Sequence, residues 1–310
     1  MLRYTVLSGF LGSGKTTLLR RALDAHLKGE VAVIVNELAP SGVDGHLIDD
    51  ACAATVEITG GCACCDKRPE LLDAMRRLLD GHERGRLGSL KHVVIETSGL
   101  ADPLSIVVAV ATDPVLRHHF ELSSVVTVVD GFGDPGLGEH PEFKRQVMGA
   151  DRLVISKTDL ATPAQVHALE GRLSGQPGAL ERTSDAWRTL LDPTRAGVMR
   201  SRRPHDEPAH EHTAGIASMS MKVEEALDWT AFGVWLTMLL HAHGRRVLRI
   251  KGVVNAKGLG PISINAVQRV LHRPEHVGSM PKEGPALVVI AEDLPADLMS
   301  CSLLAFQQIA

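Results

Sequence analysis

The sequence predicts an α/β protein: a mostly parallel sheet with helices on both faces, followed by a smaller α+β domain. Three observations lead to this prediction. Val-rich runs alternate with helix-like stretches through the first half of the chain. The runs are largely continuous rather than alternating, as in Val125–Asp130, which is typical of parallel strands buried on both faces. Aromatic residues make up only 3% of the 310 residues and hydrophobic residues 44%, so the cores should be aliphatic.

The first domain is expected to contain the parallel sheet. Its strands are expected at Tyr4–Leu7, Val31–Asn36, Thr55–Ile58, Val93–Glu96, Val125–Asp130 and Leu153–Ser156. Helices are expected over Thr16–His26, Pro69–Asp80 and Pro163–Leu173, which lie between these runs. In open α/β sheets a ligand binds at the carboxyl ends of the strands, so the residues that follow each strand are the first candidates for a site.

A change of composition after Asp192 predicts a linker over residues 195–214, which separates a first domain (1–194) from a second (215–310). The linker is rich in Arg, Pro, His and acidic residues and has no apolar periodicity. Strands of the second domain are expected at Gly215–Val223, Val247–Asn255, Ile262–Val270 and Ala286–Ala291, and helices at Glu224–Ala242 and Pro295–Gln308.

Charge and hydropathy argue against a nucleic-acid partner and a membrane partner. The formal charge is −4 and no long Lys/Arg run is present. The short group Arg200, Arg202 and Arg203 is interpreted as part of a solvated linker, so no nucleic-acid partner is expected. No apolar run approaches the length that spans a membrane, and no signal peptide is recognisable, so we expect a cytoplasmic protein without a membrane partner. Three of the five cysteines fall within four residues, which indicates metal or redox chemistry rather than a disulfide framework.

A P-loop motif follows the first expected strand. The residues from Gly9 to Thr16 read GFLGSGKT, which fits G-x-x-x-x-G-K-[ST], and they open directly into an expected helix. The glycines let main-chain N–H groups approach phosphate, Lys15 reaches the β and γ oxygens, and Thr16 offers its hydroxyl to Mg²⁺. A glycine-rich turn without a ligand is disfavoured, because strand, motif and helix are in register. The first domain is therefore expected to be a P-loop NTPase, with the nucleotide on Gly9, Gly12, Ser13, Gly14, Lys15, Thr16 and Thr17.

Two further strand ends complete the expected nucleotide site. Glu96 ends an apolar strand and is followed by Gly99, which is where a Walker B carboxylate would orient Mg²⁺. The run Ser156–Lys157–Thr158–Asp159 resembles the N/T-K-x-D element that selects guanine. Asp159 would accept from the guanine ring N–H and 2-amino group, which adenine lacks, so GTP is expected over ATP. Ser156 stands where asparagine is usual.

The cysteine cluster is a candidate metal site. Two glycines precede Cys62, Cys64 and Cys65, which places three soft donors on one short turn before an expected helix. Thiolates favour Zn²⁺, Cu(I) and related ions over Mg²⁺ or Ca²⁺. A fourth position stays open for water, Glu37, a histidine or a client, and an incomplete shell suits transfer of the metal. The alternatives are a redox dithiol or three core cysteines.

Taken together, these motifs resemble the CobW-like GTPases, a family of metal-insertion proteins and metallochaperones. GFLGSGKTT, the pair Asn36–Glu37 with Gly42–Asp44, GCACC, ETSGLADP and SKTD occur in the family's order, and Leu248–Gly252 and Ala266–Val270 are similar to its C-terminal domain. The resemblance implies a GTPase whose Cys-x-Cys-Cys turn binds Zn²⁺ or Co²⁺ under nucleotide control. It places Glu37 and Asp44 in the first switch. Pro40 and Ala39 depart from the family's usual acid and glycine.

The resulting hypothesis is a GTP-hydrolysing metallochaperone. GTP and Mg²⁺ would order the segment from Glu37 to Asp44 and the cysteine turn, and hydrolysis would release the metal to a client metalloprotein or a metal-cofactor pathway enzyme. Lys15 would stabilise phosphate charge, and Glu37, with Asp44 as second choice, would position the water. The main alternative is a regulatory GTPase that remodels a client enzyme while the cysteines sense metal or redox state. A small-molecule kinase is disfavoured, because no arginine-rich lid is found. The metal, the client, the role of the linker histidines and the choice between monomer and dimer stay open.

Overall fold

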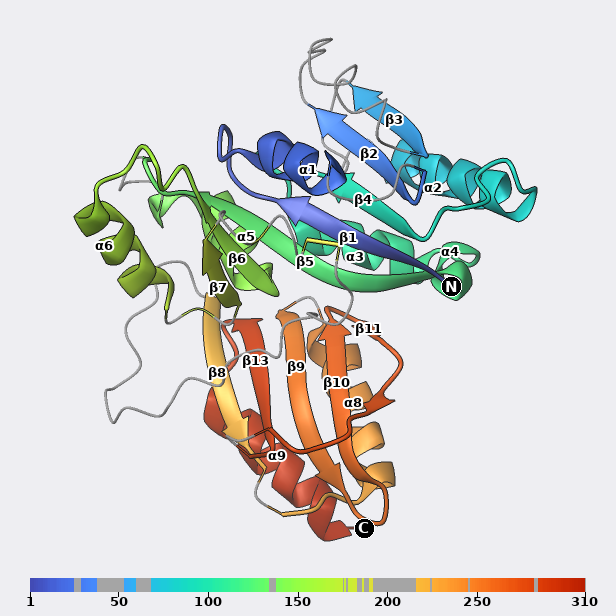
Figure 1. Ribbon diagram of the computed structural model, residues 1–310. Helices are drawn as coiled ribbons and strands as arrows, with labels where there is room; N and C mark the ends of the chain where they lie inside the picture. The colour runs from blue at the N-terminus through green and yellow to red at the C-terminus, as the bar shows by residue number, and fades with distance from the viewer. Residues whose placement is uncertain are drawn as a thin grey trace. The chain divides into compact units, whose positions relative to one another are not determined.

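The computed structural model describes most of the chain. The described residues are 1–24, 29–37, 53–59, 68–133, 138–174, 176, 178–182, 186, 190–191, 216–223, 225–244, 246–281 and 284–309. The chain divides into two compact units, residues 1–198 and 199–310, and each unit is described by itself (Figure 1). The expected linker, 195–214, lies outside the described residues.

The first unit is built on a seven-stranded parallel sheet. Its strands are β1 (Leu2–Ser8), β2 (Val31–Glu37), β3 (Ala54–Thr59), β4 (His92–Glu96), β5 (Phe120–Asp130), β6 (Arg152–Ser156) and β7 (Ala179–Arg182). Their order in the sheet is β3-β2-β4-β1-β5-β6-β7, and every neighbouring pair is parallel. The expected parallel sheet is confirmed, and its central strand, β1, is the one that precedes the P-loop.

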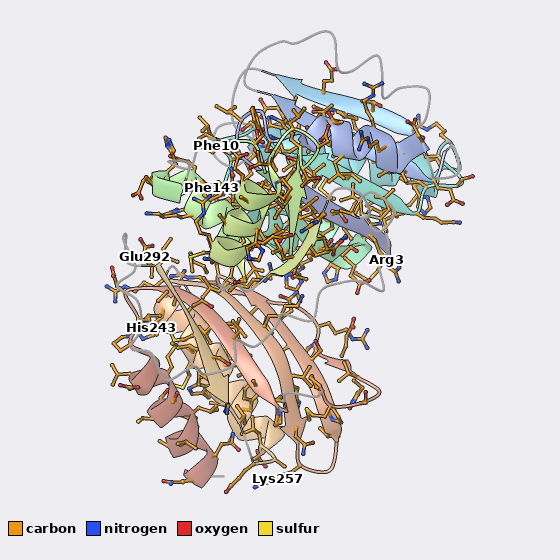
Figure 2. The ribbon with its side chains drawn as sticks, turned by 60° about the vertical axis from the view of Figure 1, so that its left-hand side comes forward. Arg3, Phe10, Phe143, His243, Lys257 and Glu292 are labelled. Carbon is orange, nitrogen blue, oxygen red and sulfur yellow. The ribbon has the colours of Figure 1, made fainter. Side chains whose placement is uncertain are left out.

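Helices cover both faces of this sheet. They are α1 (Lys15–Asp24), α2 (Arg68–Glu83), α3 (Pro103–Thr112), α4 (Leu116–His119), α5 (Pro141–Gly149) and α6 (Pro163–Leu173). Leu19 of α1 shares a core with Val154 of β6. Val147 of α5 belongs to a separate core with the next strand residue, Ile155. Because consecutive residues of a strand point to opposite faces, these two cores lie on opposite sides of the sheet, and side chains fill both (Figure 2).

Helix α3 was not expected from the sequence. Its residues, PLSIVVAVAT, are almost all apolar and include the β-branched run Ile106–Val108. Such a run is as typical of a buried strand as of a buried helix. Asp102 caps the helix by accepting a hydrogen bond from the Leu104 amide at 3.0 Å, and Pro103 occupies its first turn. Short α4, α5 and β7 were also missed, because each has too few residues to display a period.

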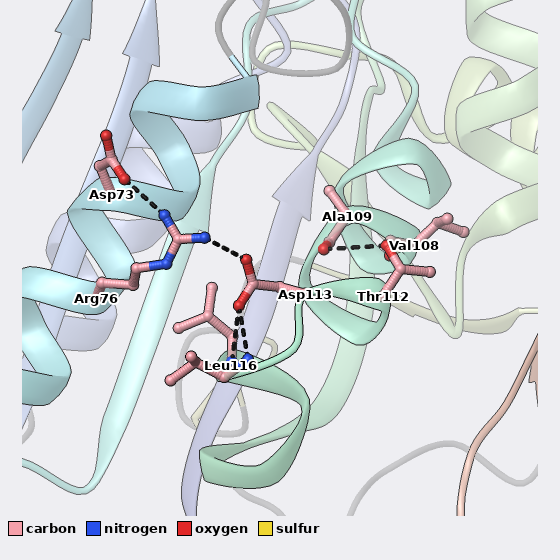
Figure 3. A network of polar contacts seen from close by, with 8 residues as sticks. Asp73, Arg76, Val108, Ala109, Thr112, Asp113 and Leu116 are labelled. Atoms are coloured by element: carbon pink, nitrogen blue, oxygen red, sulfur yellow. Dashed lines mark hydrogen bonds and ion pairs between the residues drawn. The ribbon is translucent and has the colours of Figure 1, made fainter.

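One polar contact joins α2 to the turn between α3 and α4 (Figure 3). Arg76 of α2 donates to Asp113 at 2.5 Å, and the other Asp113 oxygen accepts from the Val115 and Leu116 amides at 3.0 Å each. Burial of the Asp113 carboxyl opposes its ionisation. The hydrogen bonds from Leu116, Val115 and Arg76 outweigh burial, so the pKa of Asp113 lies below its ordinary value.

The described residues of the second unit form a six-stranded antiparallel sheet with two helices. Its strands are β8 (Ile216–Lys222), β9 (Val247–Ala256), β10 (Gly260–Val267), β11 (Val270–Leu271), β12 (Glu275–His276) and β13 (Ala286–Glu292), and its helices are α8 (Trp229–His243) and α9 (Ala296–Ile309). The sheet order is β11-β10-β9-β13-β8, with β12 also paired to β10. Phe232 of α8 and Leu303 of α9 share one buried cluster with Ile250 of β9. The expected α+β character is confirmed.

Two expected boundaries in this unit were wrong. The strand expected through Val270 ends at Val267, because Gln268 has a positive φ of 50° and turns the chain into β11. The helix expected from Glu224 begins at Trp229, because Leu227 bridges to Ala256 and the Asp228 side chain then caps α8. Across the described parts of both units, no helix has the length and apolar character needed to cross a membrane.

Candidate functional site

The P-loop glycines adopt backbone conformations that other residues rarely adopt. Gly9, Gly12 and Gly14 have φ values of 144°, 69° and 90°. A Cβ on Gly9 would lie 2.3 Å from the carbonyl oxygen of Val128 in β5. A side chain at Gly9 would therefore displace the loop from the sheet. The loop lies between the end of β1 and the first turn of α1, where N–H groups favour an anion.

Lys15 places a cation inside this loop. Its ammonium group donates to the carbonyl oxygens of Gly9 at 2.9 Å and Phe10 at 3.2 Å. The residue is 9% exposed, which is low for a lysine. A buried ammonium at the mouth of a glycine loop supplies the positive charge that a phosphate chain requires.

Thr16 and Glu96 form the oxygen pair that was expected to hold Mg²⁺. Thr16 Oγ1 donates to Glu96 Oε1 at 2.6 Å, although 80 residues separate them. The pairing arises because β4 lies beside β1, with Glu96 opposite Leu7. Glu96 is 4% exposed. A hydroxyl and a buried carboxylate are hard oxygen donors, and their chemistry fits Mg²⁺.

Buried hydroxyls around the loop fit a polar ligand. Within the described residues, Ser8 Oγ, Ser13 Oγ and Thr97 Oγ1 are buried and have no hydrogen-bond partner. Buried polar atoms are nearly always paired in folded proteins, so three unpaired hydroxyls, at the ends of β1 and β4 and in the P-loop, indicate a place for a ligand with several acceptor oxygens. The nucleotide that the sequence predicts has such oxygens.

The base-recognition element is joined to the P-loop through Ser156. The Ser156 hydroxyl lies 2.6 Å from the carbonyl oxygen of Ser13 and 3.2 Å from that of Val129, and it donates to these oxygens. Lys157 has a positive φ of 52°, and its ammonium group pairs with Asp130 at 2.6 Å. Asp130 also accepts from the main-chain amide of Phe132 at 2.9 Å. The ends of β5 and β6 thus form one connected structure.

Asp159 lies in the turn that follows β6 and is exposed. Its carboxylate is open to a ligand, while Ser156 fixes the start of the same turn against the P-loop. The structure therefore brings together the P-loop, the end of β4 and the turn after β6, as the three motifs predicted. The selection of guanine by Asp159 stays a prediction.

Sequence reasoning missed Gln146. This residue is fully buried on α5, and its amide nitrogen donates to the carbonyl oxygens of Gly99 and Ala101 at 3.0 Å each. The only signal in the sequence was a glutamine on the buried side of a short helix beside Val147. Asp130 was missed as well, because its partner Lys157 is 27 residues away.

Several candidate residues lie outside the described part of the structure. Asp44, Cys62, Cys64 and Cys65 do so entirely, as do Ala39 and Pro40. Glu37 ends β2 with its main chain described and its side chain not, and Thr17 is exposed in the first turn of α1. Among the described residues, no group of three or more His, Cys, Asp or Glu side chains could hold a metal ion.

Comparison with known proteins identifies both parts of the chain. Residues 3–181 match the model of the CobW/HypB/UreG nucleotide-binding domain, and residues 216–307 match the model of the cobalamin synthesis protein CobW C-terminal domain. The crystal structure of the Zn(II)-bound YjiA GTPase from E. coli has a TM-score of 0.73 at 24% identity, over 98% of this chain and 98% of its own. That likeness shows that the fold is shared.

Three curated relatives have related names. The zinc chaperone YjiA of Escherichia coli is 31% identical over 81% of this chain and 80% of its own length. The zinc chaperone CobW of a Sinorhizobium species is 29% identical over 92% of this chain and 91% of its own. The zinc-regulated GTPase metalloprotein activator 1 of Schizosaccharomyces pombe is 33% identical over 50% of this chain and 39% of its own.

The nucleotide-binding model covers more than half of the chain, and its limits enclose every motif of the expected nucleotide site. The C-terminal model begins and ends within the second unit. The chain therefore belongs to the CobW/HypB/UreG family of P-loop GTPases.

Proposed function

We propose that this chain is a GTP-hydrolysing metallochaperone. It binds a transition metal, Zn²⁺ or Co²⁺, through Cys62, Cys64 and Cys65, and delivers it to a client metalloprotein or a metal-cofactor pathway under nucleotide control. GTP hydrolysis is the activity of the family. The names of the relatives in Escherichia coli and Sinorhizobium support zinc as the cargo, and that of the relative in Schizosaccharomyces pombe supports a client metalloprotein.

The pairing of β2 with β3 is the observation that best supports a link between metal and nucleotide. The two strands are parallel, and Glu37 lies opposite Thr59, the last residue of β3. The three cysteines follow Thr59 after two glycines in the sequence, and α2 begins at Arg68. The segment that carries the metal motif therefore starts at the same edge of the sheet as the P-loop, beside the strand end that leads to Asp44.

Hydrolysis would use the groups that the structure gathers at that edge. Lys15 is positioned to neutralise charge that develops on the transferred phosphoryl group, and Thr16 with Glu96 would hold Mg²⁺, which supplies further positive charge at the phosphate oxygens. Glu37 is our candidate for positioning the attacking water, with Asp44 as second choice. Both flank the segment whose order would depend on the nucleotide.

The thiol chemistry explains how a metal could be held and then released. Three thiolates bind Zn²⁺ strongly but leave a fourth position for a ligand from elsewhere. A conformational change of this segment when GTP is hydrolysed would remove ligands from the metal or let a ligand from the client bind it. The affinity for metal would then depend on the nucleotide, and the affinity for the nucleotide on the metal, by the same factor.

Competition with a chromophoric chelator tests this proposal. The dissociation constant for Zn²⁺ is measured with Mg²⁺ and either GDP or a non-hydrolysable GTP analogue. We expect binding with the analogue to be tighter by about tenfold or more, within the usual range of coupling between two sites. The Cys64→Ser variant should lose both the tight binding and the difference.

The Cys301→Ser variant is the matched control, because Cys301 is an exposed thiol on α9 of the second unit. It should behave as the wild type does. Equal Zn²⁺ affinity in the two nucleotide states would contradict nucleotide control of the metal and would favour a regulatory GTPase. Metal binding that survives Cys64→Ser would remove the cysteine turn as the site.

A further inference from the structure

A buried glutamine on α5 holds the chain segment that follows the Walker B strand. Gln146 is 0% exposed, and its Nε2 atom donates to the carbonyl oxygens of Gly99 and Ala101, both at 3.0 Å. The amide NH₂ has two donors and the amide oxygen has none, so two carbonyl partners fix the orientation of the amide. Both donors of Gln146 are thus used on the loop between β4 and α3.

Gln146 is itself anchored to the sheet. Thr127, a fully buried residue of β5, donates its hydroxyl to the main-chain carbonyl oxygen of Gln146 at 2.9 Å. On the other side, Gly149 of α5 packs against α3, since a Cβ there would lie 3.0 Å from the Leu104 side chain. The glutamine therefore joins a fixed part of the sheet to the loop.

The segment that Gln146 holds touches the P-loop. A Cβ on Gly99 would lie 2.6 Å from the main-chain nitrogen of Leu11, which leaves no space for any side chain. Gly99 follows Glu96 by three residues, and Glu96 accepts the Thr16 hydroxyl at 2.6 Å. The main chain at Gly99 consequently lies at the phosphate side of the site, close to the groups that would hold Mg²⁺.

We propose that Gln146 is a positioning residue that sets the affinity of this protein for GTP relative to its affinity for GDP. By fixing two carbonyl oxygens, it holds the Gly99 main chain at the P-loop, where the terminal phosphate distinguishes the two nucleotides. Contacts to the base and to the first phosphates belong to other elements, the turn after β6 and the start of α1. The inference rests on the GTPase function and adds to it a determinant of nucleotide state that does not contact the nucleotide.

Replacement of Gln146 by an apolar side chain should act through the loop. Without the amide, two carbonyl oxygens would face an apolar group, and the segment would move to satisfy them elsewhere. Binding of GDP should change little, because its contacts do not depend on Gly99. Binding of GTP and its hydrolysis should weaken, because both require the displaced segment.

The Gln146→Met variant tests the proposal by titration with GDP and with a non-hydrolysable GTP analogue, together with single-turnover hydrolysis. We expect the ratio of the affinity for the GTP analogue to the affinity for GDP to fall about tenfold, which is the effect of losing two buried hydrogen bonds. Gln307→Met is the matched control. Gln307 likewise bonds to main chain, accepting from the Asp228 amide at 2.7 Å in the second unit, and its loss should leave the ratio unchanged.

A milder variant covers the case in which Gln146→Met does not fold. Thr127→Val removes only the hydroxyl that anchors Gln146, and it should shift the ratio in the same direction by a smaller factor. A folded Gln146→Met variant with the wild-type ratio and hydrolysis rate would overturn the inference while the GTPase function stands. Failure of the wild-type protein to bind or hydrolyse GTP would overturn both.

Discussion

The hydroxyl of Ser156 donates a hydrogen bond to the carbonyl oxygen of Ser13 at 2.6 Å. The contact joins the turn expected to bind guanine to the loop expected to bind phosphate, across 143 residues of sequence. Serine stands here in place of the usual asparagine. The observed contact shows that serine here connects the two loops, and recognition of the base by Asp159 stays a prediction.

Loss of this contact should weaken the binding of GDP and of GTP alike. We expect Ser156→Ala to reduce affinity for GDP and for a GTP analogue by about five- to tenfold each, the effect of one buried hydrogen bond. Equilibrium titration with fluorescent nucleotides measures both. Ser174→Ala is the control, because the Ser174 hydroxyl also donates to a carbonyl oxygen, that of Gly171, at 2.8 Å but at the exposed end of α6. A change confined to one nucleotide would contradict this prediction.

Asp159→Asn should change the base that is preferred. The substitution replaces an acceptor by a donor, so affinity for GTP should fall and affinity for xanthosine triphosphate should rise. Competition binding with the two nucleotides measures the exchange. Because Asp159 is exposed, its replacement should shift stability by only about 0.5 kcal/mol or less. Unchanged affinity for GTP would remove Asp159 from the base site.

Thr16→Val should reduce the effect of Mg²⁺ on nucleotide binding. Valine keeps the shape of threonine but has no hydroxyl for the metal or for Glu96. The affinity for a GTP analogue is measured with and without Mg²⁺. The increase that Mg²⁺ produces should be about tenfold smaller in the variant than in the wild type, equivalent to about 1.4 kcal/mol. Thr112→Val is the control, since the Thr112 hydroxyl bonds only within α3, to Val108 at 2.7 Å and Ala109 at 3.4 Å. A full Mg²⁺ effect in Thr16→Val would place the metal elsewhere.

Asp113 should make stability depend on pH. Its pKa is lower in the folded chain than its ordinary value of 3.8. The stabilisation is therefore complete above the unfolded pKa and is lost as pH falls through the folded pKa. We expect Asp113→Ala to cost about 1 to 2 kcal/mol at neutral pH, because the turn loses the acceptor for two amides. The difference in stability between Asp113→Ala and the wild type should become smaller at acid pH.

Thermal unfolding across pH 2 to 7, on the scale over which carboxyl groups titrate, checks this behaviour. Asp80→Ala is the control: Asp80 pairs with Arg84 and Arg86 at the surface, where all three side chains are at least 43% exposed. Its loss should cost about 0.5 kcal/mol or less. A loss of stability in Asp113→Ala that is the same at pH 2 and pH 7 would exclude, as its cause, the ion pair with Arg76 and the hydrogen bonds from the Val115 and Leu116 amides.

The sequence was informative wherever a requirement is local. The P-loop was recognisable because glycine, lysine and threonine must occur at fixed spacing for one turn to hold phosphate, and the structure places positive φ at Gly9, Gly12 and Gly14. The strands were recognisable because a buried parallel strand is continuously apolar. Helix α3 was not, because a helix buried on most sides is also continuously apolar.

The sequence by itself determined the fold class, the three nucleotide motifs and the resemblance to a family. Only the tertiary structure decided which distant groups meet: the Ser156 side chain with the Ser13 carbonyl oxygen, Lys157 with Asp130, and the Gln146 side chain with the Gly99 carbonyl oxygen. The physical reason is the order of the strands. β5 lies beside β1 and β6 lies beside β5, although both strands follow β1 by more than 100 residues, and a hydrogen bond across such a distance leaves no periodic or contiguous pattern in the sequence.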